Sequence, residues 1–179
     1  FTEAGEEQYF YCVFVDITEE KQLQERVGEL YEQELAYFAE LAASEGSIQG
    51  RVNVTRNRIE NYLSTADTAV ARVGDTYDAT VEHLAASAVD AGYGAQIRRT
   101  LERAKVLADY AAGKTDYRFS FLRRRNGKGA FWASTSLRTC LNPETGDVVA
   151  FFYTFDVTEQ KIQEQLLTKI ARVDYDIIT

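Results

Sequence analysis

The residues of this sequence that could carry chemistry are few and lie far apart. His83 is the only histidine, and the two cysteines, Cys12 and Cys140, form no Cys-x-x-Cys pair. A zinc site needs closely spaced Cys or His ligands and a disulfide framework needs several cysteines, so we expect neither, and a reducing cytoplasm is the default location. The glycines within residues 92–94 are too few for a phosphate-binding loop and follow no strand pattern. The sequence therefore predicts no metal site, no catalytic residue and no enzyme activity.

Polar and aromatic side chains instead alternate along one predicted strand, residues 130–141. The four that share one of its faces are Trp132, Ser134, Ser136 and Arg138. Alternate residues of a strand point to the same side of a sheet, so this set could bind a polar or anionic ligand if its face borders a cavity. If the opposite face, with Phe131, Thr135 and Leu137, borders the cavity instead, the cavity is apolar and filled by side chains.

The composition bounds the class of protein. The chain has 179 residues, 45% of them hydrophobic and 27% charged, which suits one globular domain with extensions. Its net charge of −8 argues against a nucleic-acid partner, and we interpret the basic run over residues 123–125 as a solvated strand end. No apolar run approaches the ~20 residues that a membrane span needs. The sequence starts at Phe1 and not at a methionine, so we expect it to be part of a longer protein, which can carry a membrane anchor elsewhere.

A short internal repeat organises the chain. Residues 9–24 read YFYCVFVDITEEKQLQ, and residues 149–164 read VAFFYTFDVTEQKIQE. Each copy is an aromatic and β-branched run, typical of a strand, that stops at Asp-x-Thr-Glu-x-Lys and continues with helical spacing. In the second copy Asp156 can accept backbone N–H bonds at the helix start with Glu159 completing a capping box, or Thr158 can be the cap. The pattern predicts, twice, a strand that runs directly into a helix.

Helices are predicted after both copies of the repeat, over residues 19–45 and 159–172. Apolar residues at heptad spacing predict that these long linker helices pair as coiled coils. The first helix has a heptad stripe of Leu23, Val27, Leu30, Tyr37 and Leu41, interrupted by Glu34, and beside it a second stripe of Tyr31, Leu35, Phe38 and Ala42. The alternative for the first helix is that it packs back onto its own domain, and both interpretations hold together if residues 31–42 cap the domain while residues 19–30 dimerise. We interpret Glu34 and its acidic neighbours as solvated helix surface.

Between these helices the pattern predicts an α+β domain. A hairpin near residues 55–57 is followed by helical stretches at residues 65–73, 77–88 and 97–111 and by strands at residues 117–122, 130–141 and 148–157. Consecutive strands joined by short turns pair in an antiparallel manner. The order predicts a five-stranded antiparallel sheet with helices on one face.

The end of this domain resembles the C-terminal half of a PAS domain. The similar run, FSFLRRRNGKGAFWASTSLRTCLNPETGDVVAFFYTFDVTEQK, contains the aromatic pair Phe131-Trp132 and the final Asp-Val-Thr-Glu-x-Lys. The resemblance covers about residues 115–162. It is looser over residues 46–114, where residues 89–92 stand in place of a Pro-Asp-Asp element of the family.

The resemblance implies that the chain belongs to a bacterial signalling protein with several units. Residues 46–158 would form the complete PAS-like domain, residues 1–18 the last strand of a preceding unit, and residues 173–179 a candidate first strand of a following one. Similar units occur in tandem in proteins that end in GGDEF, EAL or histidine-kinase modules. The orphan strand within residues 9–16 is then expected to pair with another chain, because an uncovered strand edge aggregates.

The resemblance also implies a regulatory function. A signal would pass from the sheet to the C-terminal helix at a junction, and a homodimer of linker helices would supply two states. The junction residues are Asp156, Thr158, Glu159 and Lys161. The alternatives are a passive interaction and spacer module without a ligand, and a small ligand-processing enzyme.

No cofactor of the family is indicated. Haem-binding members use a helical histidine, for which His83 is the only candidate, and we interpret it as a surface residue. Flavin photosensors carry an Asn-Cys-Arg-Phe-type helical motif, which is absent here, and Cys140 lies on a predicted strand. We interpret Cys12 and Cys140 as buried small apolar residues and leave the cofactor unassigned.

Overall fold

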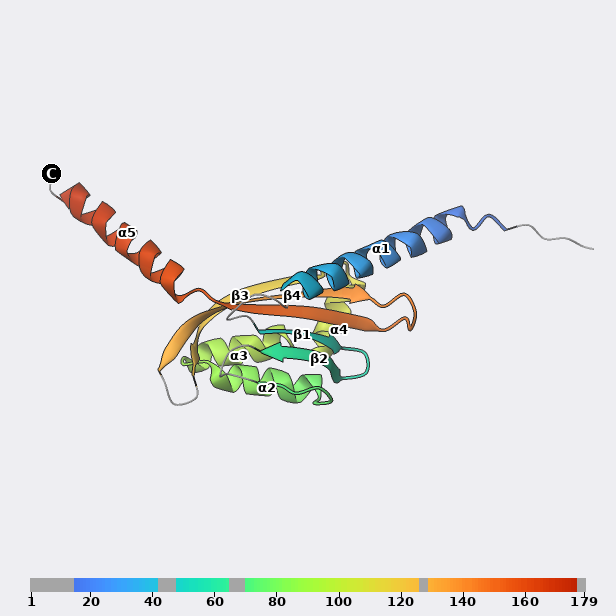
Figure 1. Cartoon of the computed structure of the whole chain (residues 1–179), viewed down its shortest axis with the longest axis horizontal. Helices are drawn as coiled ribbons and strands as arrows, with labels where there is room; N and C mark the ends of the chain where they lie inside the picture. The colour runs from blue at the N-terminus through green and yellow to red at the C-terminus, as the bar shows by residue number, and fades with distance from the viewer. Residues whose placement is uncertain (1–14, 42–47, 65–69, 126–128, 177–179) are drawn as a thin grey trace, which may run out of the picture.

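A five-stranded antiparallel sheet is the centre of the structure, a computed structural model that describes residues 15–41, 48–64, 70–125 and 129–176. The strands are β1 (Ile48–Asn53), β2 (Arg58–Ser64), β3 (Asp116–Arg124), β4 (Ala130–Leu141) and β5 (Val148–Asp156). Their order across the sheet is β2-β1-β5-β4-β3, so the first and the last strand lie side by side in its middle (Figure 1). The predicted five antiparallel strands are confirmed.

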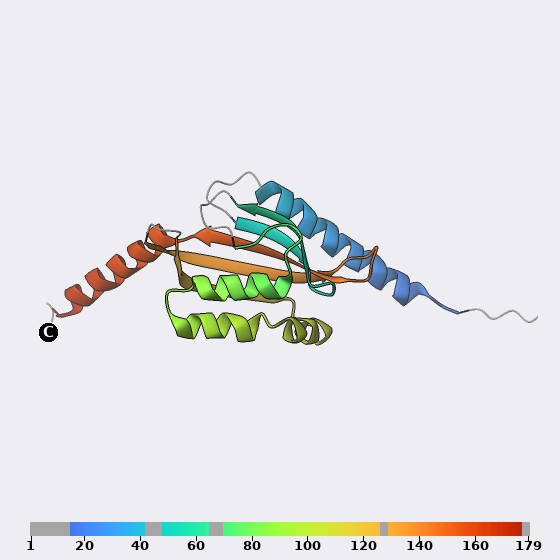
Figure 2. The same ribbon diagram turned by 90° about the horizontal axis from the view of Figure 1, so that it is seen from below.

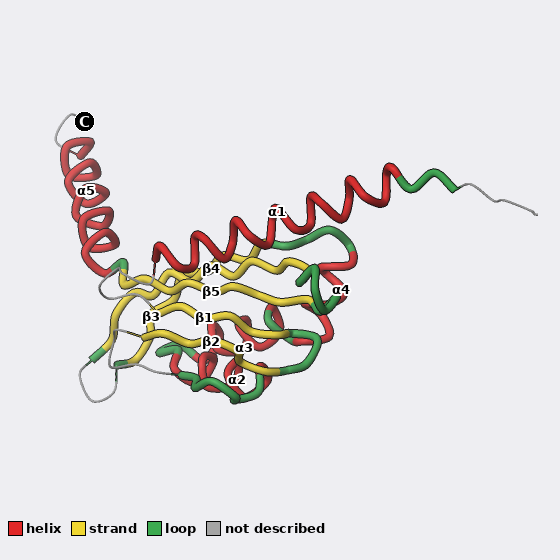
Figure 3. Tube along the Cα trace, turned by 45° about the vertical axis from the view of Figure 1, so that its right-hand side comes forward, coloured by secondary structure: helices red, strands yellow, loops and turns green. Residues whose placement is uncertain are grey.

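Helices cover both faces of the sheet, but unequally. α2 (Tyr77–Ser87), α3 (Ala91–Thr100) and α4 (Arg103–Ala111) lie against one face (Figure 2). α1 (Thr18–Leu41) lies along the opposite face with its C-terminal half, and α5 (Thr158–Asp176) extends away from the end of β5 (Figures 1 and 3). None of the described helices has the length and apolar character that a bilayer crossing requires.

The main core lies between the sheet and the three short helices. On β4 the apolar residues Phe131, Ala133 and Leu137 are at most 5% exposed and pack in one cluster with Val81 of α2 and Val106 of α4. Burial of apolar surface contributes about 25 cal/mol per Å², which makes this cluster the main source of stability. The other face of β4 is only half buried, which is why its sequence alternates.

α1 builds a second, smaller core on the opposite face. The rings of Tyr31 and Phe38 pack edge-on against Phe151 of β5, with centroids 6.1 and 5.7 Å apart. The prediction that residues 31–42 pack on their own domain is confirmed for residues 31–38. Because β5 is covered on both faces, its sequence is a continuous apolar run and does not alternate.

The absence of a side chain at Gly50 leaves room for an aromatic ring where the two middle strands meet. Gly50 of β1 lies opposite Phe152 of β5, and a Cβ on Gly50 would lie 2.2 Å from that ring. The same Cβ would lie 2.9 Å from the carbonyl oxygen of Asn61 on β2. Glycine is therefore required at this position, where a backbone and a side chain approach closely.

The predicted helix over residues 97–111 is wrong, because this region forms two helices. α3 begins before it, at Ala91, after the capping residue Asp90. Beyond α3 the side chain of Leu101 is buried, and its carbonyl oxygen accepts a hydrogen bond of 2.7 Å from the hydroxyl of Tyr77. In a continuous helix this carbonyl would accept a hydrogen bond from a backbone N–H of the next turn. Because it accepts from Tyr77 instead, the chain turns before α4.

Two other boundaries differ from the prediction. Residues 70–73 are not helical, although the pattern predicts a helix over residues 65–73. α5 continues to Asp176, so residues 173–176 form a helical turn where we expect a first strand, and that expectation is wrong for them. The remaining residues of both predictions, and the strand predicted within residues 9–14, lie outside the described residues.

Candidate functional site

The start of β4, the end of β5 and the start of α5 are joined by a closed set of hydrogen bonds. The backbone N–H of Trp132 donates to the hydroxyl oxygen of Thr158 over 2.9 Å, and that hydroxyl donates to the carboxylate of Asp156 over 2.5 Å. The N–H of Thr158 donates to the same carboxylate oxygen over 2.9 Å. The N–H of Val157 donates to the carbonyl oxygen of Trp132 over 2.8 Å. The direction in which α5 leaves the sheet is thereby tied to β4.

Of the four predicted junction residues, the structure brings Asp156 and Thr158 together. Asp156 also forms an ion pair with Arg125. Among the described residues the hydrogen bonds of this junction do not involve the exposed side chain of Glu159, so the predicted capping box is wrong, and the cap is a turn from Asp156 to Thr158. Lys161 pairs with Glu164 over 2.7 Å on the helix surface.

The first copy of the repeat has the same turn at its helix start. The N–H of Thr18 donates to the carboxylate of Asp16 over 2.9 Å, as Thr158 does to Asp156. Hydrogen bonds from Thr18 hold the pKa of Asp16 below its ordinary value. The sequence repeat is therefore a repeated structural turn. Within the described residues, the first copy has no neighbouring strand that takes the part of β4.

A small cavity lies between the sheet and the helices on its inner face. Its volume is about 40 Å³, and its lining is mostly apolar side chains of α2 and the sheet. The hydroxyl groups of Thr135 and Thr154 lie 2.9 Å apart and satisfy each other. Ligand pockets begin at about 300 Å³, so this space holds water-sized molecules only.

Arg123 on β3 belongs to the wall of this cavity and is an unexpected residue there. It is 1% exposed, and its guanidinium lies 5.8 Å from the ring centroid of Phe131. Burial lowers the pKa of Arg123 from its ordinary value. The interpretation of residues 123–125 as a solvated strand end is therefore wrong for Arg123. The signal was present in the sequence, because alternation places Arg123 on the same face as Phe121.

The predicted ligand-binding residues lie on the opposite face of the sheet from this cavity. Phe131, Thr135 and Leu137 face the helices and are at most 5% exposed, so the apolar alternative describes the inner face. The residues on the α1 side are Trp132, Ser134, Ser136 and Arg138. Ser136 and Arg138 line a pocket of about 310 Å³ between α1 and the sheet, and the other two do not.

Arg138 connects three elements at this outer pocket. It donates to the carboxylate of Asp116 on β3 over 2.8 Å and to that of Glu34 on α1 over 2.5 Å. These bonds raise the pKa of Arg138 and hold the pKa of Asp116 below its ordinary value. Glu34 is 7% exposed, so its interpretation as solvated helix surface is wrong. α1 is fixed to β4 by an ion pair as well as by its aromatic contacts.

The histidine and the described cysteine stand apart from both pockets. His83 is exposed on α2 and contacts the carbonyl oxygen of Val70 at 3.3 Å. Cys140 is a free thiol beneath α1, and burial raises its pKa to about 12, which disfavours the reactive thiolate. Within the described ranges, no group of three or more potential metal ligands comes together.

Comparison with known proteins gives similarity at the level of solved structures. No protein-family model and no curated protein matches the sequence significantly. An RNA-binding light-oxygen-voltage receptor is 18% identical, with a TM-score of 0.49, over 79% of this chain but only 37% of the receptor. The N-terminal domain of a diguanylate cyclase with a PAS/PAC sensor from Marinobacter aquaeolei is 10% identical, with a TM-score of 0.40, over 64% of this chain and 98% of that one. The PAS domain of BvgS from Bordetella pertussis is 13% identical, with a TM-score of 0.44, over 80% and 98%.

The class of the protein follows from its own topology. The sheet order β2-β1-β5-β4-β3, with three helices between β2 and β3 packed on one face, defines an α+β domain whose last strand leads into a helix. The described residues between 48 and 156 have a PAS-like α+β fold, as the resemblance over residues 115–162 predicts.

Proposed function

We propose that this chain is a regulatory sensory PAS module that relays a signal through α5 to an effector outside this sequence. The observation that carries the proposal is the hydrogen bond from the N–H of Trp132 to the hydroxyl of Thr158. Because this bond ties the first turn of α5 to β4, a shift of β4 along β5 changes the direction of the helix. A bistable element of this kind is what a relay requires.

The outer face supplies an input to the same strand. Arg138 near one end of β4 pairs with Glu34 of α1, and Trp132 near the other end bonds to Thr158 of α5. A displacement of α1 therefore reaches α5 through a single strand. The resemblance associates such modules with tandem PAS units and with GGDEF, EAL or histidine-kinase effectors, and we place this one in the cytoplasmic part of such a protein.

A homodimer through the linker helices is part of this proposal. Leu23 and Leu30 of α1 are 66% and 53% exposed, and Ile162 and Leu166 of α5 are 50% and 54% exposed. Each pair has the spacing of a helical stripe, and such a stripe gains stability when a partner helix covers it. The covered stripe of α1 begins at Tyr31, so the two halves of α1 would serve different purposes.

A chimaeric histidine kinase tests the relay. The chain is fused through α5 to a kinase core, and autophosphorylation is compared for the parent chimaera, Thr158→Val and Thr168→Val. Thr168 is the matched control, because its hydroxyl bonds within α5 to the carbonyl oxygen of Glu164 over 2.8 Å and not to the sheet. We expect Thr158→Val to change kinase output and Thr168→Val to leave it unchanged. Equal output of all three proteins would contradict the relay.

The passive spacer module is the second candidate function, and the size of the inner cavity favours it. A cavity of about 40 Å³ leaves no room for an organic signal molecule between α2 and the sheet. A spacer predicts that the chimaera dimerises but that its output does not depend on Thr158. Sedimentation analysis together with the kinase assay therefore separates the two candidates.

A further inference from the structure

β3 is an edge strand, and two contacts show how its backbone groups are oriented. The N–H of Thr139 on β4 donates to the carbonyl oxygen of Thr115 over 2.8 Å, so odd-numbered residues direct their backbone groups toward β4. The N–H of Val89 donates to the carbonyl oxygen of Leu122 over 2.9 Å from the other side. Even-numbered residues of β3 therefore direct their N–H and C=O groups away from the sheet.

This edge is covered at one end and open along the rest. A bridge from Ala88 to Arg123 covers the end. The backbone N–H and C=O groups of Arg118 and Ser120 have no protein partner within the described part of the chain. Proteins block exposed edges with proline, bulges, short length or charged side chains. Of these devices β3 has only charged side chains, because it is 9 residues long, has no proline and pairs with β4 without a register shift.

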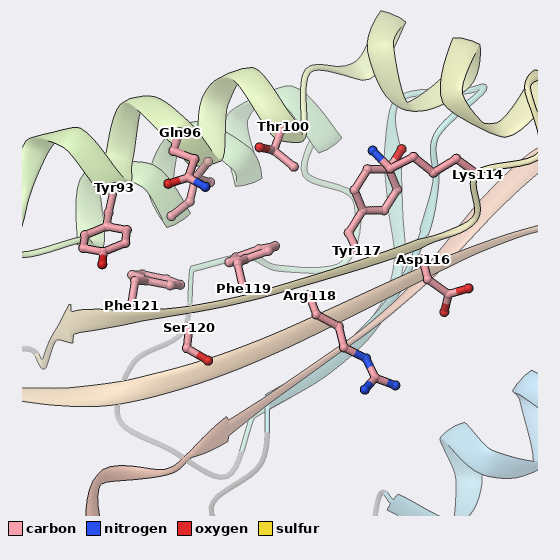
Figure 4. A pocket seen from close by; sticks show the side chains of 11 residues that line it. Tyr93, Gln96, Thr100, Lys114, Asp116, Tyr117, Arg118, Phe119, Ser120 and Phe121 are labelled. Atoms are coloured by element: carbon pink, nitrogen blue, oxygen red, sulfur yellow. The ribbon is translucent and has the colours of Figure 1, made fainter. Parts of the chain in front are cut away.

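A hollow lies on each side of this open edge. A groove of about 390 Å³ runs between α3 and β3, where Tyr93 faces the strand and Phe119 and Phe121 point toward the helix (Figure 4). The outer pocket of about 310 Å³ lies beneath α1. Arg118 lines both hollows, and Figure 4 shows it and Ser120 on the side of β3 away from the aromatic rings.

The two hollows differ in chemistry. The groove beside α3 offers aromatic surface, including Tyr93, which is 43% exposed. On the outer side Arg138 is shared between Asp116 and Glu34, whereas Arg118 forms no ion pair among the described residues, although its charge also lowers the pKa of Asp116. Side chains of an added strand would alternate between these sides, because successive strand residues point in opposite directions.

From this arrangement we infer that the β3 edge binds an extended peptide segment of a partner protein by strand addition. The segment carries apolar side chains that enter the α3–β3 groove and, alternating with them, acidic side chains that face Arg118. Backbone bonds to Arg118 and Ser120 supply affinity, and the two hollows supply selectivity. This surface is separate from the α5 junction, so the inference goes beyond the proposed function.

Binding of a labelled peptide to the full chain tests the inference. The probe is a fluorescein-labelled peptide of about nine residues in which Val and Phe alternate with Glu, and its comparison peptide has Lys in place of Glu. By fluorescence polarisation we expect the Glu peptide to bind about tenfold more tightly, equivalent to about 1.4 kcal/mol. Arg118→Glu should reverse this preference. Equal binding of both peptides to the unmodified chain, or no binding of either, would overturn the inference.

Ser120→Pro tests the backbone part of the same inference. The N–H of Ser120 points away from β4, so proline removes a donor of the open edge without removing a bond of the β3–β4 ladder. Ser120→Ala keeps the N–H and is the matched control. We expect Ser120→Pro to weaken binding of the Glu peptide about tenfold and Ser120→Ala to leave it unchanged.

Two outcomes of the Ser120 comparison would overturn strand addition by a partner peptide. The first is unchanged peptide binding by a folded Ser120→Pro protein. The second is loss of self-association in that variant by sedimentation, which would assign the edge to a second copy of this chain. If Ser120→Pro does not fold, the charge reversal by Arg118→Glu decides the question alone.

Discussion

The backbone N–H of Trp132 lies 2.9 Å from the hydroxyl oxygen of Thr158 and donates to it. The same hydroxyl donates to Asp156, so one threonine side chain links β4, the end of β5 and the first turn of α5. A side chain that accepts from one element and donates to another fixes their relative position more tightly than a cap within a single helix. This link makes the junction testable by a single substitution.

Thr158→Val removes both bonds of this hydroxyl while keeping a β-branched side chain of similar shape. We expect the domain to lose about 1 kcal/mol of unfolding free energy and the amide of Trp132 to exchange about fivefold faster, because its acceptor is gone. Hydrogen exchange followed by mass spectrometry or NMR measures this. Thr168→Val, whose hydroxyl bonds only within α5, should leave the Trp132 amide unchanged. Equal exchange rates in both variants would contradict the link.

Arg138→Ala should loosen α1 from the sheet. The side chain of Glu34 is 9% exposed and would lose its ion pair, whereas the side chain of Arg138 is 49% exposed, so we expect a loss of about 1–2 kcal/mol, less than for a fully buried pair. Chemical denaturation measures the loss, and a double-mutant cycle with Glu34→Ala isolates the pair. Arg118→Ala, on the same side of the sheet without an ion pair, is the control. A coupling energy of zero would show that the aromatic contacts alone hold α1.

Much of this fold could be predicted from local patterns, because alternation and helical spacing report which residues share a face. They do not report which element covers that face. For this reason the strand that carries Trp132 and Arg138 could be predicted. That α1, and not the short helices, covers the face with these two residues could not. The burial of Glu34 and Arg123 could not be predicted for the same reason, because each lies on an apolar stripe and tertiary packing decides which element covers it.

The break between α3 and α4 could not be predicted for a different reason. It depends on the hydroxyl of Tyr77, which is distant in sequence and donates a hydrogen bond to the carbonyl oxygen of Leu101. The local spacing of apolar residues is compatible with one continuous helix, and only the packed core selects two. The Asp-x-Thr turn, in contrast, is determined within three residues, and both of its copies therefore form as the repeat suggests.

Asp147 should make the stability of the domain depend on pH in the acidic range. Hydrogen bonds from the amide of Asn53, together with the charge of Arg56, lower the pKa of Asp147 below its ordinary value of 3.8. A group whose folded pKa is depressed stabilises the folded state above its unfolded pKa and loses that contribution as the pH falls through the folded value. Asp147→Asn should therefore lower the melting temperature by a few degrees at neutral pH.

The difference between the two proteins should begin to shrink as the pH falls below 3.8 and should vanish below the lower pKa of the folded protein, where both carry an uncharged side chain at this position. Thermal melts from pH 3 to pH 7 measure the difference. Glu144→Gln, an exposed residue of the same turn, is the control and should behave like the unmodified protein throughout. A constant difference between Asp147→Asn and the unmodified protein at all pH values would contradict the assigned cause.

Gly50→Ala should destabilise the sheet where its two middle strands meet. The added methyl group would lie 2.2 Å from the ring of Phe152 and 2.9 Å from the carbonyl oxygen of Asn61, and the backbone oxygen cannot move aside as a side chain can. Overpacking of this kind costs about 1–3 kcal/mol.

Gly28→Ala is the matched control, because its methyl group meets nothing within 4 Å on α1, and it should stabilise the helix by about 0.5–1 kcal/mol. Urea denaturation should thus move the two midpoints in opposite directions, and adding Phe152→Leu to Gly50→Ala should recover part of the loss. A Gly50→Ala protein as stable as the unmodified one would mean that the ring of Phe152 has room to leave β1.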